Sequence, residues 1–184
     1  MSEKRRKLEQ AATEAVQKIG LTNLSFRALA DEVGIKSASV HYYFPGKSDL
    51  AATLIEGYSE KFSALLSESS SESSSLQSTM TAFMSIFEQV LADGKFCLCG
   101  MMAAEVESLD SNSRALLQSY FEVSEAWLTK LMDSHRDELS TSLPSQTLAR
   151  VIMSGMEGAI LLDRVGGGKK RLDAQKELIH SLLL

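Results

Sequence analysis

Apolar residues recur at steps of three and four along most of this 184-residue chain. In the first such segment, residues 3–19, they share one face of a helix: Leu8, Ala12, Ala15, Val16 and Ile19. The chain contains two prolines, and alternating runs of β-branched residues are rare. The periodicity therefore predicts an all-α protein of about nine helices.

The first fifty residues contain three of the predicted helices, over about residues 3–19, 26–33 and 37–44. Ser25 is a suitable N-cap for the second helix, Gly34 ends it, and the pair Pro45-Gly46 breaks the third. Two short helices joined by a glycine turn form a helix-turn-helix arrangement, whose later helix enters the major groove of DNA. We therefore expect a DNA-binding domain, the head, over residues 1–47.

The remaining residues, 48–184, are expected to form a helical body that binds an effector and dimerises. Its helices are predicted at about residues 47–66, 76–92, 99–108, 111–136, 145–165 and 172–184. A serine-rich stretch over residues 67–78 is predicted to be a loop.

The net charge of −5 taken alone argues against nucleic acid as a partner. The charge is unevenly distributed, however. Residues 1–50 carry eight basic and six acidic side chains, whereas the remainder carries eleven basic and eighteen acidic ones. This asymmetry would turn the net-positive first fifty residues, rather than the acidic remainder, towards a polyanion.

The segment SFRALADEVGIKSASVHYYFPGKSDL, residues 25–50, resembles the DNA-binding signature of TetR-family transcriptional regulators. The residues that carry the resemblance are Arg27, Leu29, Ala30, Val33, Gly34, Ile35, Ala38, Ser39, Val40, Tyr43, Phe44, Lys47 and Leu50. It extends over about residues 6–58. The chain departs from the family pattern at His41, where tyrosine is usual, and at Lys36, where a small polar residue is common.

The resemblance implies a repressor that binds a palindromic operator in double-stranded DNA. The implied DNA-binding residues are Ser25, Arg27, Lys36, Ser37, Ala38, Ser39, His41, Tyr42, Tyr43 and Lys47. Of these, Tyr42, Tyr43 and Lys47 would hold phosphates. Packing of the two tyrosines against neighbouring helices is the alternative.

The resemblance also implies a homodimer built from the last two helices. Gly155 and Gly158 would let helices approach closely, and Leu162, Ile179 and Leu182 would supply apolar area. The alternative is a core helix whose small residues serve its own packing.

Bodies of this family usually enclose a pocket for a small-molecule effector. The candidate lining residues are Met84, Phe87, Cys97, Met101, Phe121 and Trp127. Methionine adapts its shape to varied apolar ligands, although the same residues could fill a tight core.

The stretch GKFCLCGMMAAE, residues 94–105, resembles the "G-C-L-x-G-x-x-A-A-E" segment of a TetR branch that includes electrophile- and chlorine-responsive repressors. Cys97 falls on the cysteine of that branch, and a thiol near a helix N-terminus is more reactive towards oxidants and electrophiles. The alternative is that Cys97 and Cys99 are small buried hydrophobic residues. Two cysteines are too few for a disulfide framework or a structural zinc site, so we expect no metal or cofactor.

Two other classes of function compete with the DNA-binding regulator. A thiol-based redox protein using Cys97 lacks a convincing nearby base and leaves the head unexplained. A helical adaptor would bind protein through the head. We expect a non-enzymatic protein, and we expect it in the cytoplasm because the N-terminus lacks the apolar core of a signal peptide and the chain has no membrane-spanning apolar run.

Overall fold

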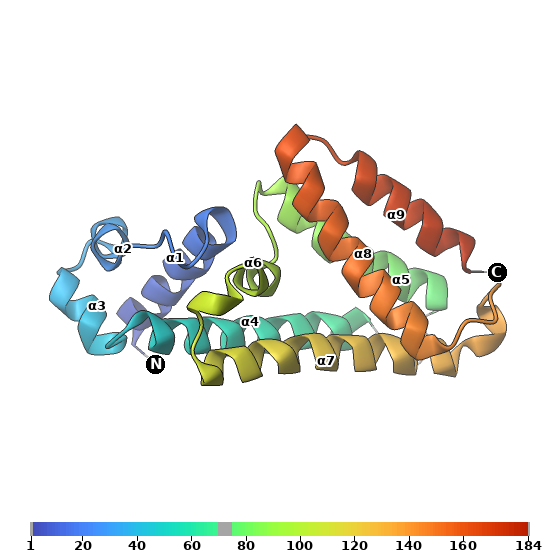
Figure 1. Ribbon diagram of the computed structural model, residues 1–184, viewed down its shortest axis with the longest axis horizontal. Coiled ribbons are helices and arrows are strands. Elements are labelled where there is room, and N and C mark those ends of the chain that lie inside the picture. The colour runs from blue at the N-terminus through green and yellow to red at the C-terminus, as the bar shows by residue number, and fades with distance from the viewer. Residues whose placement is uncertain (1, 70–74, 184) are drawn as a thin grey trace. The chain divides into compact units, whose positions relative to one another are not determined.

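The structure is a computed structural model that describes residues 2–69 and 75–183. Within these residues the chain forms nine α-helices and two short 3-10 helices (Figure 1). The α-helices are α1 Glu3–Ile19, α2 Phe26–Val33, α3 Ser37–Tyr43, α4 Lys47–Ser69, α5 Leu76–Ala92, α6 Leu98–Ala104, α7 Ser111–Ser134, α8 Ser145–Gly166 and α9 Lys170–Ser181. The 3-10 helices are Val106–Ser108 and Arg136–Glu138. The predicted all-α class and helix number are confirmed.

The predicted helix limits need correction at several ends. The helix expected over residues 99–108 is α6 followed by a separate 3-10 turn, and the one expected over 111–136 ends at Ser134. Helices α4 and α5 both extend into the predicted loop over residues 67–78. The rest of that loop, residues 70–74, and the expected last helical residue, Leu184, lie outside the described residues.

The chain has two compact units. The first comprises residues up to 60 together with 97–120, and the second comprises the remaining described residues. Helices α4 and α7 therefore each contribute to both units. The predicted boundary between residues 47 and 48 separates DNA binding from effector binding and dimerisation, and it does not coincide with the compact units. It stays a prediction.

In the first unit, α1 packs against α2 and α6, and α2 packs against α3. Its buried apolar residues include Leu8, Ala12, Val16, Leu29, Val40, Phe44, Leu50, Leu98 and Met102. The α1 stripe predicted from the sequence supplies three of these. Ile19, at the end of the same stripe, is 52% exposed because the helix stops there.

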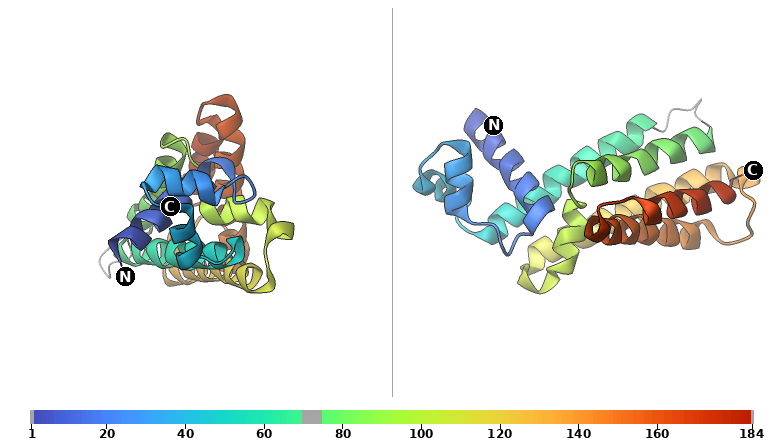
Figure 2. Two further views of the ribbon diagram at one scale, coloured as in Figure 1. Left: turned by 90° about the vertical axis from the view of Figure 1, so that its left-hand side faces the viewer. Right: turned by 90° about the horizontal axis from the view of Figure 1, so that it is seen from above.

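In the second unit, α8 packs against α5 and α9, and α8 and α9 run antiparallel (Figures 1 and 2). Gly167 ends α8 with a φ of 66°, which permits the reversal between them. An added Cβ at Gly155 would lie 2.2 Å from the side chain of Gln175, so glycine allows α9 to approach α8. The core residues include Phe62, Met80, Phe83, Met84, Phe87, Leu128, Ile152, Met156, Ile160 and Ile179.

None of the helices in the described part of the chain combines the length and the apolar character that crossing a membrane requires.

Candidate nucleic-acid interface

Helix α3 is held in place by the turn before it and by two buried side chains. Gly34 ends α2 in the left-handed conformation, with a φ of 72°. Lys36 then takes an extended backbone conformation as the N-cap of α3. Val40 and Phe44 lie one helical turn apart and are 0% and 1% exposed. Because these two residues anchor one side of α3 in the core, its other side faces outward.

The outward side of α3 carries many hydrogen-bonding groups. Its exposed residues are Lys36, Ser37, Ala38, His41 and Tyr42, while Ser39 and Tyr43 are half-buried. Tyr42 is 82% exposed, which is high for an aromatic side chain. Small residues allow a helix backbone to approach the major groove, and hydroxyl, imidazole and ammonium groups can bind base edges and phosphates.

The two DNA contacts predicted at the start of α2 are Ser25 and Arg27, and only Ser25 also has a structural role. Ser25 is the N-cap of α2, and its Oγ accepts a hydrogen bond from the backbone N–H of Ala28 at 3.3 Å. Arg27, the second residue of α2, is exposed. Its guanidinium can therefore reach a phosphate without breaking a cap.

The aromatic residues of α3 pack partly within the head. His41 contacts the ring of Phe26 in α2, with centroids 5.1 Å apart. The Oη of Tyr43 lies 3.2 Å from the Oγ of Ser2, next to the start of α1, and its ring meets Tyr42 edge-on. His41, where the chain departs from the family pattern, therefore helps to pack α3 on α2 while remaining exposed.

Lys47, the first residue of α4, makes contacts that the sequence did not predict. Its ammonium donates hydrogen bonds to the carbonyl oxygens of Leu21 at 3.1 Å and Thr22 at 2.8 Å. Backbone acceptors in a distant turn leave no residue-type signal, so sequence reasoning could not find them. One of the three ammonium N–H donors remains for a phosphate.

The basic residues at the start of α1 are partly neutralised by neighbours on the same helix. Arg5 pairs with Glu9 at 2.8 Å, and Lys7 pairs with Glu3 at 2.9 Å. The hydrogen bond from Lys7, together with its charge, lowers the pKa of Glu3. Arg6 is exposed, and no ion pair of Arg6 is found among the described residues. Lys4 is exposed as well, and no ion pair of it is found among the described residues, so Lys4 and Arg6 are the cations of this group available to meet a phosphate.

The six predicted effector residues divide between the two units. Cys97 and Met101 belong to the first unit, and Met84, Phe87, Phe121 and Trp127 belong to the second. Met84 and Phe87 are buried, and Trp127 stacks on the buried Phe83 with centroids 5.9 Å apart. These contacts pack the second unit. A role of the six residues in effector binding stays a prediction.

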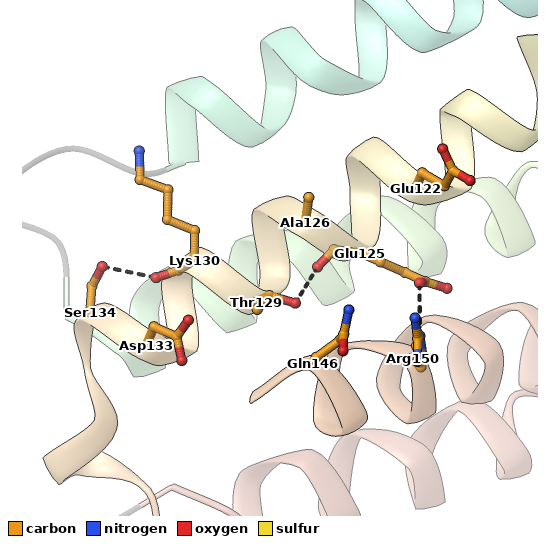
Figure 3. A pocket seen from close by; sticks show the side chains of 9 residues that line it. All are labelled: Glu122, Glu125, Ala126, Thr129, Lys130, Asp133, Ser134, Gln146 and Arg150. Atoms are coloured by element: carbon orange, nitrogen blue, oxygen red, sulfur yellow. Dashed lines mark hydrogen bonds and ion pairs between the residues drawn. The ribbon is translucent and has the colours of Figure 1, made fainter. Parts of the chain in front are cut away.

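The second unit also contains two surface clefts. One, of about 710 Å³, lies between α7 and α8 and is lined by charged and polar side chains (Figure 3). An ion pair of 3.4 Å between Glu125 and Arg150 links its two walls. The other cleft, of about 610 Å³, lies where α5, α8 and α9 meet. Among the described residues that line the two clefts, none is a predicted effector residue.

The two thiols are both buried. Cys97 is 2% exposed and is the N-cap of α6, where its Sγ accepts a hydrogen bond from the N–H of Gly100 at 3.5 Å. The same sulfur lies 3.6 Å from the Oη of Tyr120. Cys99 is 0% exposed. An electrophile therefore reaches either sulfur only if this region moves.

The five predicted dimer residues have different environments. A Cβ added at Gly158 would meet no described atom within 4 Å, whereas Gly155 faces α9 of its own chain. Leu162 is 52% exposed, Leu182 is half-buried and Ile179 is 1% exposed. Leu178, the neighbour of Ile179, is 49% exposed. Three further apolar residues of α8 are exposed: Val151 (49%), Leu161 (44%) and Val165 (89%).

Val151 and Val165 add to the exposed apolar area that the sequence predicted on α8. On α8, residues 151, 158, 161, 162 and 165 are spaced by three, four and seven positions, so they share one face. We call this face the α8 stripe. On α9, Leu178 is exposed and Ile179 is buried, and the role of the five predicted residues in a dimer stays a prediction.

Both the sequence and the fold of this chain are similar to those of known proteins. Residues 9–54, from α1 into α4, match the model of the bacterial regulatory proteins of the tetR family. A TetR transcriptional regulator from Legionella pneumophila is 29% identical, with 100% of this chain and 99% of that chain covered and a TM-score of 0.92.

Two further structures share the fold. A TetR-family regulator from Agrobacterium tumefaciens is 24% identical over 98% of both chains, with a TM-score of 0.92. The reduced form of NemR from E. coli is 17% identical over 99% of this chain and 98% of that chain, with a TM-score of 0.82. No curated protein matches the chain in sequence. The helix-turn-helix match and the similarity over the whole chain show that this protein belongs to the TetR family of DNA-binding transcriptional regulators.

Proposed function

We propose that the protein is a repressor that binds a palindromic operator as a homodimer and releases it when a small apolar or electrophilic effector binds the body. The observation that carries this proposal is the outward side of α3, where Tyr42 is 82% exposed while Val40 and Phe44 anchor the helix. In a homodimer, the two α3 helices held about 34–36 Å apart would contact the major groove on successive turns of one duplex.

The proposed contacts divide into two groups. The side chains of Lys36, Ser37, Ser39 and His41, with the small Ala38 permitting close approach, face the major groove and supply the sequence readout. Phosphate contacts come from Ser25, Arg27, Tyr42, Tyr43 and Lys47. Phosphate contacts fix the position of the head, whereas base contacts distinguish sequences.

The α8 stripe, with Leu178 of α9, supports the dimer. Four apolar residues of α8 between Val151 and Val165 are at least 44% exposed, and Gly158 leaves room between them. Apolar area exposed in this pattern on one helix face is typical of a surface that a second copy covers.

A mobility-shift titration tests the proposal directly. The probe is DNA from upstream of the protein's own gene, at several salt concentrations, with the full-length chain. Ala38→Glu places a carboxylate on the outward side of α3 and is expected to abolish the shift, whereas Ala126→Glu on the exposed surface of α7 is the matched control. If the wild-type protein shows no salt-dependent binding to this DNA or to a random-sequence library, the repressor proposal is wrong.

The electrophilic effector has its own test. Cys97 accepts a hydrogen bond from Gly100 and lies beside Tyr120, so alkylation or oxidation of its sulfur would disturb both contacts. Cys97→Ser is expected to prevent the release of operator DNA by N-ethylmaleimide or hypochlorite, and Cys99→Ser serves as the control. If N-ethylmaleimide or hypochlorite still releases DNA from the Cys97→Ser variant, the proposal of an electrophilic effector is wrong and only the apolar effector remains.

A further inference from the structure

The turn between α1 and α2 is held by two charged side chains from distant parts of the chain. Glu105 accepts hydrogen bonds from the backbone N–H groups of Leu21 at 2.7 Å and Thr22 at 3.2 Å. Lys47 donates to the carbonyl oxygens of the same two residues, at 3.1 and 2.8 Å. Both N–H groups and both carbonyl groups of this dipeptide are therefore bound by ionic partners. We call this arrangement the turn clamp.

Gly20 gives independent support for a close fit at this point. Its φ is 82°, in the region that favours glycine. A Cβ at this position would lie 2.4 Å from Oε1 of Glu105 and 3.0 Å from its Cδ. The carboxylate can approach the turn only because residue 20 has no side chain. The backbone conformation and the close approach both require glycine, so the turn is shaped around Glu105.

The turn clamp joins α6 to the head. Glu105 is the C-cap of α6, and α6 packs against α1. At the other end of α6, the N-cap Cys97 lies 3.6 Å from the Oη of Tyr120, whose ring contacts Tyr58 of α4. A seven-residue helix is thus tied at one end to α7 and at the other to the turn that leads into the helix-turn-helix.

Hydrogen bonds to ionised groups are stronger than those between neutral groups, and backbone N–H groups cannot move away from the carboxylate without moving the turn. A displacement of α6 therefore either carries Leu21 and Thr22 with it or breaks the bonds. Because α2 begins only a few residues later, at Phe26, either outcome changes how α2 and α3 are held.

We propose that Glu105 and Lys47 are positioning residues for DNA binding, and that the turn clamp transmits the position of α6 to the head. This inference rests on the proposed function for its use of DNA. In it, Glu105 contacts no DNA and acts through the peptide groups of Leu21 and Thr22.

The first test needs no DNA. Amide hydrogen exchange is measured at Leu21 and Thr22 in the full-length protein. Glu105→Ala should speed exchange at both amides by about tenfold or more, because the ionic acceptor is lost. Glu105→Gln should retain much of the protection, since its carbonyl oxygen still accepts. Glu107→Ala removes the same charge two residues away, from a side chain 90% exposed in a surface pair with Arg114, and should leave exchange unchanged.

The second test uses duplex DNA that the wild-type protein selects from a random library. Glu105→Ala should weaken binding by about fivefold or more while the slope of log K against log salt stays the same, because no phosphate contact is lost. Glu105→Gln should recover most of the affinity, and Glu107→Ala should match the wild type. A fall in slope for Glu105→Ala would contradict the positioning role.

Gly20→Ala extends the test with a double-mutant cycle. The added Cβ displaces Glu105, so Gly20→Ala should weaken DNA binding by itself, and the double variant Gly20→Ala/Glu105→Ala should be little weaker than Gly20→Ala. Fully additive losses, or exchange at Leu21 and Thr22 that is the same in Glu105→Ala and Glu107→Ala, would overturn the inference. If the wild type selects no DNA, the repressor proposal fails, while amide exchange still decides whether the turn clamp holds.

Discussion

The outward side of α3 and the α8 stripe are both well exposed, yet they differ in chemistry. On the outward side of α3 the exposed residues are Lys36, Ser37, Ala38, His41 and Tyr42. On the α8 stripe they are valines and leucines, with Val165 89% exposed. Each helix keeps its opposite side in a core, through Val40 on α3 and Met156 on α8.

The difference indicates two kinds of partner. Donors and acceptors on a small helix suit base edges and phosphates, which are strongly polar and hydrated. A face of valines and leucines finds little apolar surface on DNA beyond thymine methyl groups, whereas each square ångström of it that a second protein surface removes from water contributes about 25 cal/mol. The two exposed sides therefore fit a protein that meets DNA through one helix and a copy of itself through another.

The largest expected effect comes from charging the α8 stripe. Leu162→Glu places a carboxylate among apolar residues that the proposed dimer would bury, so it should raise the dimer dissociation constant about thirtyfold or more, or about 2 kcal/mol or more. Sedimentation analysis of the full-length chain measures this. Binding to a palindromic operator should fall with it, because a single head makes half the contacts.

Leu143→Glu is the matched control for this experiment, since Leu143 is 47% exposed in the segment before α8. It should leave the dimer intact. If Leu162→Glu remains as dimeric as Leu143→Glu, the dimer interface lies elsewhere and the proposed contrast between α3 and α8 fails.

The pairing of α8 with α9 depends on Asp163, which is 2% exposed. Its carboxylate accepts hydrogen bonds from the N–H groups of Arg171 at 3.0 Å and Leu172 at 2.9 Å, at the start of α9. Burial raises the pKa of Asp163, but the hydrogen bonds from Leu172 and Arg171 outweigh it, and the pKa is lowered overall. Asp163→Asn should therefore lower the melting temperature at neutral pH and weaken the dimer.

The same substitution should change the pH dependence of stability. Because the folded pKa lies below the ordinary value of about 3.9, the carboxylate stabilises the fold fully above about pH 4, and this contribution is lost as the pH falls through the lowered value. Thermal unfolding between pH 7 and pH 3 should show the wild type and Asp163→Asn converging at the acid end. Asp133→Asn, at an exposed position of α7, should not differ from the wild type.

Much of the fold could be predicted because its signals are local. Ser25 and Gly34 mark the two ends of α2, and both act there as expected. The separation of Val40 and Phe44 from the exposed residues of α3 follows from helical spacing together with the family pattern. Such features depend on neighbours within a few positions, which a single sequence contains.

The turn clamp and the exact face of α9 could not be predicted in this way. Glu105 binds N–H groups 83 and 84 residues away, and Lys47 binds carbonyl groups in the same turn. Backbone partners are the same for every residue type, so the sequence does not identify them. On α9, Leu178 and Ile179 are adjacent and equally apolar, and only packing shows which one is buried.

Lys47→Ala tests whether Lys47 contacts a DNA phosphate or acts only in the turn clamp. If the remaining ammonium donor holds a phosphate, the slope of log K against log salt should fall by about 0.9 for each head bound, for all DNA sequences alike. Fluorescence anisotropy at four or more salt concentrations measures the slope. Lys130→Ala removes an exposed lysine from α7 as a control. An affinity loss without a change of slope would assign Lys47 to the turn clamp alone.

The smallest expected effect is that of Tyr42→Phe, which removes one hydroxyl from the most exposed aromatic side chain of the head. The ring can keep its edge-on contact with Tyr43, so stability should not change. A hydrogen bond from a hydroxyl to an ionised phosphate contributes roughly 1.5 kcal/mol, so affinity for the operator should fall about tenfold. The salt slope should stay constant, because the hydroxyl carries no charge. Tyr42→Ala, which also removes the ring, should lose more, and equal binding by Tyr42→Phe and the wild type would remove this hydroxyl from the interface.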